Sequence, residues 1–214
     1  MAKKADIANH IVTTAVNLAG EKGWRALTVA EVAQAARVPV SALYRHCPTK
    51  PDLLAGFSRM IDQTVLSEGL PGADESPRDR LFDLLMRRFD MLSGHRAGIK
   101  AILRDLRFDP LTALLQARQL ELSMRWTLQS AGISTDGLRG RARVQALGLL
   151  YGLVLRVWEQ DDSPDLDRTM KALDQRLRQA EQWENTFGRG RRVRRAEEPP
   201  TAPEAMEGEE PTLH

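Results

Sequence analysis

Apolar side chains recur every three or four positions through most of the sequence. In residues 6–22 they are Ile7, Ile11, Ala15, Leu18 and Ala19. This spacing places them on one face of an α-helix, whereas a half-buried strand requires alternation with a period of two. We find no convincing run of alternating β-branched residues bounded by turns, and helix-favouring residues such as Ala, Leu, Arg and Glu are abundant. The sequence therefore predicts an all-α protein.

Residues 28–50 divide this pattern into two short helices. Thr28 and Glu31 form the Thr-x-x-Glu pattern of a capping box, which predicts a helix start. Pro39 suits the first turn of the next helix, and Pro48 predicts its end. Two short helices that are joined by a tight turn and braced by longer ones form a helix-turn-helix, so this stretch predicts a DNA-binding head.

Longer helices are predicted on the C-terminal side of this stretch. Thr49 with Asp52 repeats the capping pattern, and Ser76 followed by Pro77 predicts another helix start after a linker rich in helix breakers. Further helices are expected over about 96–107, 109–130, 141–160 and 165–184. The predicted domains are a head (1–66), a helical ligand-binding and dimerisation body (67–187) and a disordered, basic-then-acidic tail (188–214).

The basic charge is concentrated near the N-terminus. Residues 1–50 contain seven basic and three acidic residues, a net charge of +4, so the remainder sums to −2 in a chain of net charge +2. A basic segment on a near-neutral body fits a nucleic-acid-binding head. Charge alone is explained more simply by a solvated surface, so the prediction depends on the motif.

The motif residues keep a defined order and spacing. They are Leu27-Thr28-Val29, Val32-Ala33, Val38, Leu43-Tyr44-Arg45-His46, Lys50 and Asp52-Leu53-Leu54. Over about residues 7–57 they resemble the DNA-binding domain of TetR-family transcriptional regulators. The resemblance implies a TetR-like fold, in which a three-helix helix-turn-helix head precedes a helical ligand-binding and dimerisation body.

Two positions depart from the pattern of that family. Arg37 stands where the family usually has glycine, and it costs about 1 kcal/mol if the turn requires a positive φ. Cys47 stands where the family usually has phenylalanine, and this smaller side chain is expected to loosen the end of the recognition helix. Neither change removes a polar contact to DNA.

Nine residues are predicted to contact DNA: Thr28, Arg37, Val40, Ser41, Ala42, Tyr44, Arg45, His46 and Lys50. The fork of Arg45 matches O6 and N7 of guanine, although a phosphate contact or a solvated side chain is also compatible with its position. The small residues Val40, Ser41 and Ala42 allow a helix to enter the major groove, or they reflect local packing.

The other predicted DNA contacts are to phosphates. The resemblance implies phosphate contacts for Tyr44 and His46. Lys50 and Thr28 lie near predicted helix starts, where backbone N–H groups bind anions, and Arg37 adds a further positive charge. Such contacts position a protein on DNA without specifying the sequence.

The body resemblance implies a ligand cavity and a dimer interface. The candidate cavity residues are Phe89, Ile99, Leu103, Leu122 and Trp126. The last two predicted helices resemble the dimer interface of that family, which is a four-helix bundle made with a second copy. The candidate interface residues are Leu147, Leu150, Val154, Met170, Leu173 and Leu177. The alternative for each of these residues is a place in an ordinary hydrophobic core.

Residues 77–184 also resemble the TetR-fold, lipid-binding accessory proteins of ubiquinone biosynthesis. The shared features include Arg88-Phe89-Asp90, Arg104-Asp105-Leu106, Asp109-Pro110 and Trp158. This resemblance implies an alternative function, a lipid-binding accessory protein of quinone metabolism with a vestigial head. The intact basic motif opposes it, as does the polar, arginine-rich segment after Trp183, which lacks the apolar face of a membrane-docking helix.

No catalytic or metal-binding motif is found, so we expect neither an enzyme nor a cofactor. His10, His46, His95 and His214 are scattered, and Cys47 has no second cysteine with which to form a disulfide. We find no secretory signal, and no apolar run approaches the ~20 residues that span a bilayer, so a cytoplasmic protein without stable membrane insertion is expected.

The sequence thus predicts a ligand-responsive, homodimeric regulator, expected to be a repressor, that binds a palindromic site on double-stranded DNA. Its effector is expected to be small and apolar or lipid-like. The arginine run at 189–195 is compatible with a minor-groove arm, an anionic-lipid contact or a solvated tail.

Overall fold

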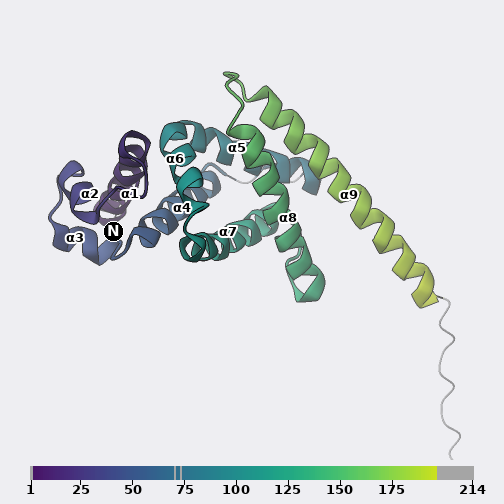
Figure 1. Ribbon diagram of the computed structural model, residues 1–214. Coiled ribbons are helices and arrows are strands. Elements are labelled where there is room, and N and C mark those ends of the chain that lie inside the picture. The colour runs from purple at the N-terminus through teal and green to yellow at the C-terminus, as the bar shows by residue number, and fades with distance from the viewer. Residues whose placement is uncertain (1, 70, 73, 197–214) are drawn as a thin grey trace, which may run out of the picture. The chain divides into compact units, whose positions relative to one another are not determined.

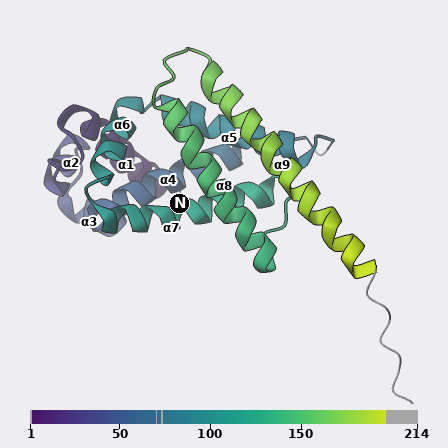
Figure 2. The ribbon, with the colours of Figure 1, turned by 45° about the vertical axis from the view of Figure 1, so that its right-hand side comes forward.

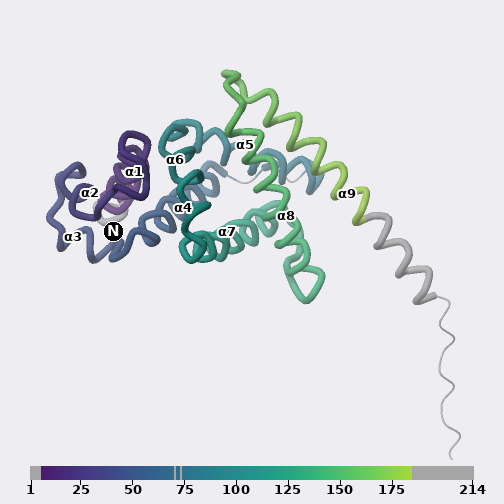
Figure 3. The backbone as a smooth tube through the Cα atoms, in the orientation of Figure 1, coloured from purple at the N-terminus to yellow at the C-terminus, as the bar shows by residue number. Residues whose placement is uncertain are grey.

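The computed structural model describes residues 2–69, 71–72 and 74–196, with side chains described between residues 6 and 184 of these ranges (Figure 3). Every regular element in the described part is an α-helix, so the all-α prediction is confirmed. The helices are α1 (Ala2–Lys22), α2 (Val29–Ala35), α3 (Val40–His46), α4 (Lys50–Ser67), α5 (Pro77–Ser93), α6 (Arg96–Leu106), α7 (Pro110–Ser130), α8 (Gly137–Trp158) and α9 (Asp167–Ala196). None of the described helices combines the length and apolar composition of a membrane span.

Both predicted capping boxes are present in the head. At α2, the backbone N–H of Thr28 donates to Glu31 Oε2 at 2.9 Å, and the N–H of Glu31 donates to Thr28 Oγ1 at 3.3 Å. At α4, Thr49 and Asp52 form the same pair of hydrogen bonds at 3.0 and 3.3 Å. These caps satisfy backbone N–H groups that have no partner inside the helix, and so they fix where α2 and α4 begin.

The turn between α2 and α3 is a Schellman motif. The N–H of Val38 donates to the carbonyl of Ala33 at 3.0 Å, and that of Arg37 donates to Gln34 at 3.1 Å. Arg37 has a φ of 54°, in the left-handed region that favours glycine. The turn therefore holds a non-glycine residue at positive φ, which costs about 1 kcal/mol of conformational free energy.

Helix α4 connects the head to the body. Figure 1 and Figure 2 both show it running from the head helices towards α7. Helix α6 also packs closely against α1, because a Cβ atom on Gly98 would lie only 2.0 Å from the carbonyl oxygen of Val16. The backbone N–H of Arg25 adds a hydrogen bond of 2.9 Å to Asp105 Oδ2 in α6. The head is thus attached to the body through α4 and through the α1–α6 contact.

The hydrophobic core is continuous from head to body. In the head, Ile11, Leu27, Leu43 and Leu53 are fully or almost fully buried. In the body, the largest fully buried side chains include Leu84, Leu85, Phe89, Met124 and Trp158. Helices α4, α5, α7 and α8 surround this part of the core. Helix α4 therefore packs against the head helix α1 and against the body helices α5 and α7 through one hydrophobic core.

Three helix boundaries differ from the expected ones by four residues or more. Helix α1 begins at Ala2 rather than near residue 6. Helix α8 begins at Gly137 rather than near 141. Its first turn, Gly137-Leu138-Arg139-Gly140, contains two glycines, which the sequence pattern assigns to a loop. Helix α9 continues to Ala196, beyond the expected end near 184, into part of the segment that was expected to be disordered. Arginine is a good helix former, so the composition of that segment does not oppose the extension. Residues 197–214 of the predicted tail lie outside the described residues, and the division into three domains stays a prediction.

Candidate nucleic-acid interface and body pocket

Helix α3 presents a continuous exposed face. Val40, Ser41, Tyr44 and Arg45 are exposed, with 55% and 67% of the surface accessible for Val40 and Tyr44. Leu43 is fully buried on the opposite side and anchors the helix to the core of the head. The structure thus brings together four of the predicted DNA-contacting residues on one surface, and the large apolar and aromatic groups among them are left uncovered.

The other two predicted residues of α3 lie at the edge of this face. Ala42 and His46 are half-buried, and His46 lines a pocket on the side of the helix that faces α1 and α4. Arg37 is exposed in the turn just before α3. An exposed guanidinium at this position is available to a phosphate flanking the groove that α3 would occupy.

The hydroxyl group of Thr28 is used inside the α2 cap. It donates to Glu31 Oε2 at 2.8 Å, and the same carboxylate forms an ion pair with Lys22 at 2.8 Å. The hydrogen bond from Lys22 and those from Thr28 lower the pKa of Glu31 to about 2. A phosphate at this helix end would therefore approach a carboxylate, and a phosphate contact by Thr28 remains a prediction.

The ammonium group of Lys50 lies in the junction between α4 and the α1–α2 connection. Its Nζ donates to the carbonyl oxygens of Trp24 at 2.6 Å and Arg25 at 3.3 Å, and it lies 5.0 Å from the centre of the Trp24 ring. Burial lowers the pKa of Lys50, although the nearby carboxylates of Asp105 and Asp109 act in the opposite direction. Sequence reasoning gave Lys50 only a phosphate contact, and it missed this internal role.

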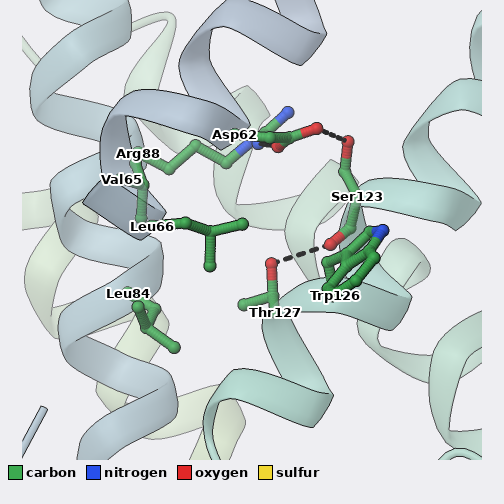
Figure 4. A pocket seen from close by; sticks show the side chains of 8 residues that line it. All are labelled: Asp62, Val65, Leu66, Leu84, Arg88, Ser123, Trp126 and Thr127. Carbon is green, nitrogen blue, oxygen red and sulfur yellow. Dashed lines mark hydrogen bonds and ion pairs between the residues drawn. The ribbon is translucent and has the colours of Figure 1, made fainter. Parts of the chain in front are cut away.

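A second site lies in the body among α4, α5 and α7. Figure 4 shows its lining, which consists of Asp62, Val65, Leu66, Leu84, Arg88, Ser123, Trp126 and Thr127. The space measures about 10 Å³, about enough for one water molecule. Apolar side chains therefore surround a polar group of residues in a narrow pocket.

The guanidinium of Arg88 organises this pocket. It forms an ion pair with Asp62, and it donates from Nε to the Tyr151 hydroxyl and from Nη2 to the Ser58 hydroxyl, both at 3.2 Å. The second carboxylate oxygen of Asp62 accepts a hydrogen bond of 2.5 Å from Ser123. Burial by itself lowers the pKa of Arg88, but Tyr151 and Asp62 more than offset this effect and raise it. The network joins α4, α5, α7 and α8 through one buried charge.

Only one of the predicted cavity residues lines this pocket. Trp126 does so, but Phe89 is a core residue whose ring stacks on Tyr151 with centroids 5.2 Å apart. Ile99 is buried and Leu103 half-buried in α6, while Leu122 is 53% exposed on α7.

Sequence reasoning missed Arg88, Asp62 and Ser123. A signal was present for Arg88, which falls four positions after Leu84 and four before Leu92 and so lies within the apolar stripe of α5. A charged residue at such a position requires a buried partner.

The candidate dimer residues require a correction. Leu147, Leu150, Val154, Leu173 and Leu177 are buried in the core of the single chain, and only Met170 is exposed, at 38%. The exposed apolar positions of α8 are instead Leu138, Ala142, Ala146, Leu149 and Leu153. Helix α8 carries apolar residues on both faces, and spacing alone does not distinguish its inner face from its outer face.

Comparison with known proteins agrees with this architecture. Residues 11–56 match the family model for bacterial regulatory proteins of the tetR family. No curated protein matches the sequence. A TetR transcriptional regulator from Nitrosomonas europaea is 21% identical, with a TM-score of 0.65 over 82% of this chain and 98% of that chain. One from Rhodococcus sp. RHA1 is 23% identical, with a TM-score of 0.57 over 83% and 98% of the two chains. A third, from Streptomyces coelicolor, is 17% identical, with a TM-score of 0.55 over 91% and 93%.

Proposed function

Since this chain has a TetR-family helix-turn-helix head and the fold of TetR-family transcriptional regulators, we propose that it is a ligand-responsive repressor that binds a palindromic DNA site as a homodimer. The observation that carries this proposal is the exposed face of α3, in which Val40, Ser41, Tyr44 and Arg45 lie together. Small side chains at the start of this face let the helix approach base edges in a major groove ~12 Å wide. Arg45 reads guanine, while Tyr44 and His46 bind phosphates.

Two copies of α3 must reach successive major grooves about 34–36 Å apart. The outer face of α8 supports the required dimer, because Ala142, Ala146, Leu149 and Leu153 follow one another at intervals of four, three and four. Gly148 lies beside this stripe, and a Cβ atom there would meet open space, so the glycine is not required by packing within the chain. An apolar helix stripe of this kind packs against the same stripe of a second copy.

The body pocket supports an effector that is small and mainly apolar with one polar group. Val65, Leu66 and Leu84 supply apolar contacts, and Arg88 and Asp62 supply the polar ones. Such a molecule must widen the pocket in order to enter it. Widening moves α5 and α7 away from α4, to which they are joined by the contacts of Arg88 and Ser123 with Asp62. Binding then favours a conformation in which the two heads no longer match the operator, because the effector has different affinities for the two states.

Selection of genomic fragments by the purified protein tests the proposal. Binding of the best fragment is then measured over a series of salt concentrations for the wild type, Arg45→Ala and Arg118→Ala. The last of these removes an exposed arginine on α7 and serves as the matched control. We expect sequence-specific binding with a steep salt dependence, weakened and relaxed in specificity by Arg45→Ala only. Absence of enrichment, or equal effects of the two variants, would contradict the proposal.

One observation favours the alternative of a lipid-binding accessory protein. Leu111, Leu115, Leu122 and Trp126 are exposed along one side of α7, a pattern suited to contact with lipid or with another protein. Co-sedimentation with anionic phospholipid vesicles tests it. Binding that is lost in Leu115→Glu, together with no enrichment of DNA fragments, would make the accessory function the better explanation.

A further inference from the structure

The head contains a pocket of its own, apart from the pocket in the body. It has a volume of about 180 Å³ and lies among α1, the C-terminal end of α3, and α4. Its apolar wall includes Val12 and Cys47, each only 2% exposed, and the half-buried Met60. Arg59 and Gln63 supply polar groups at its exposed side. The pocket therefore has an apolar interior and a polar, positively charged rim.

Two short residues, Cys47 and Gly56, form part of the pocket wall. Cys47 is the C-cap residue of α3, and its short side chain is 2% exposed. A Cβ atom on Gly56 would lie 2.8 Å from Val12 Cγ1 and 3.6 Å from Cys47 Sγ. Gly56 therefore lets α4 pack closely against Val12 of α1, and the space is bounded at this wall by Val12 and Cys47.

We propose that this head pocket binds a small aromatic carboxylate, with the ring against Val12, Cys47 and Met60 and the carboxylate at Arg59. The volume agrees with a ligand of this size, since an apolar cavity of about 150 Å³ accommodates benzene. The site differs in position and in chemistry from the body pocket, and the binding itself does not rest on the proposed function.

The charge of the ligand follows from the polar groups at the rim. The Arg59 guanidinium has no hydrogen-bond or ion-pair partner among the described residues, and one of its terminal nitrogens lies 3.8 Å from the Cβ position of Gly56. The amide of Gln63 supplies a further hydrogen-bond donor at the same rim. The nearby carboxylate of Asp52 is held by the Thr49 cap of α4. An anion therefore meets an uncommitted cation and a donor at this rim.

Cys47 contributes shape rather than reactivity. Burial raises the pKa of its thiol, against a smaller opposite effect from the charge of Arg59. The thiol stays protonated near neutral pH, so it neither repels a carboxylate nor acts as a nucleophile. Substitution of Cys47 by serine should therefore preserve the pocket, whereas a large side chain at this position should fill it.

The test uses the full-length protein labelled with ¹³C in its methionine methyl groups and titrated with benzoate. Met60 lines the head pocket, whereas Met124 lies fully buried in the body and reports on unrelated changes. We expect a saturable shift of the Met60 signal with a dissociation constant of about 0.1–1 mM, and no shift of Met124. An unchanged Met60 signal up to about 10 mM benzoate would overturn the proposal.

Variants locate the ligand and establish its charge. Cys47→Phe should abolish the benzoate-dependent shift, while Cys47→Ser should retain it. Ala8→Leu fills the same pocket from α1 and provides a second test if Cys47→Phe does not fold. Arg59→Gln should weaken benzoate about tenfold and leave the binding of neutral benzyl alcohol unchanged. Benzoate binding that survives a folded pocket-filling variant would place the site elsewhere, and benzoate binding unaffected by Arg59→Gln would exclude a carboxylate-specific site.

Discussion

The guanidinium of Arg88 and the carboxylate of Asp62 form a buried ion pair that ties α5 to α4. Arg88 is only 6% exposed, and its other hydrogen bonds go to the hydroxyl groups of Tyr151 and Ser58. Because α4 begins in the head at Lys50, this pair links the polar centre of the body to the helix that carries the head. The free energy of the pair therefore bears both on stability and on the position of α4.

Removal of one partner of this pair should be strongly destabilising. Asp62→Ala leaves the buried charge of Arg88 without its carboxylate, and we expect the free energy of unfolding to fall by about 3–5 kcal/mol. The double variant Asp62→Leu/Arg88→Met removes both charges and should lose less than Asp62→Ala alone. Urea unfolding of the three proteins measures these differences. A loss below about 1 kcal/mol in Asp62→Ala would show that Arg88 finds another partner or water.

Arg37→Gly should stabilise the head. Arg37 has a φ of 54° at the position after the α2 C-cap, where glycine avoids the steric cost of a Cβ atom. We expect a gain of about 0.5–1 kcal/mol in the free energy of unfolding. Arg37→Ala is the matched control, since it removes the guanidinium but keeps the Cβ atom and should bring no gain. If the two variants have the same free energy of unfolding, any change from the wild type comes from the lost charge and not from the positive φ.

Lys50→Met separates an internal role from a phosphate contact. Its ammonium donates to the carbonyl oxygens of Trp24 and Arg25, so the variant should lower thermal stability. Each phosphate contact that is lost reduces the slope of log affinity against log salt by about 0.9. We expect an unchanged slope for Lys50→Met, as for the control Lys100→Met in α6. A slope reduced by about one unit in Lys50→Met alone would show that Lys50 contacts phosphate.

The α2 cap should make the stability of the protein depend on pH. The pKa of Glu31 is lowered from 4.5 to about 2 by Lys22 and Thr28. A lowered carboxyl pKa contributes stability above the unfolded value and loses it as the pH falls towards the folded value. The difference in melting temperature between the wild type and Glu31→Gln should therefore be largest near pH 6 and shrink between about pH 4.5 and 2. A constant difference across this range would show that the charge of Glu31 contributes nothing.

Leu149→Glu should disrupt the homodimer. Leu149 is 72% exposed on the outer face of α8, so the substitution does not disturb the core of the single chain. A carboxylate at the centre of an apolar dimer interface would be buried without a partner. Sedimentation velocity should then show a monomer, while Leu122→Glu, at an exposed leucine of α7, should remain dimeric. A wild-type protein that sediments as a monomer would rule out the dimer itself.

The local signals in the sequence predicted most of the fold because they depend on neighbouring residues. The capping boxes at Thr28 and Thr49 and the Ser76-Pro77 start are all present in the structure. The exposed face of α3 could also be anticipated, because the motif fixed which of its residues belong together. Local chemistry determines such features, and tertiary contacts do not override it here.

The sites in the body depend on partners that are distant in sequence. Arg88 meets Asp62 and Tyr151 only after three helices have packed. Leu150 and Leu149 are adjacent in the sequence, yet one is 8% exposed and the other 72%. Helical periodicity identifies apolar positions, but only the packed structure shows which of them face inwards.

The continuity of α4 has a consequence for protein engineering. One uninterrupted helix from Lys50 to Ser67 carries the Thr49 cap and Lys50 at its start, and Ser58 and Asp62 further along. A chimaera joined in the middle of this helix would pair the head of one protein with the polar contacts of another. One way to exchange DNA specificity between such proteins is to transplant the α3 residues alone. The other is to place the junction after Ser67 and to transfer Arg88 and Ser123 as well, because both contact Asp62 of α4.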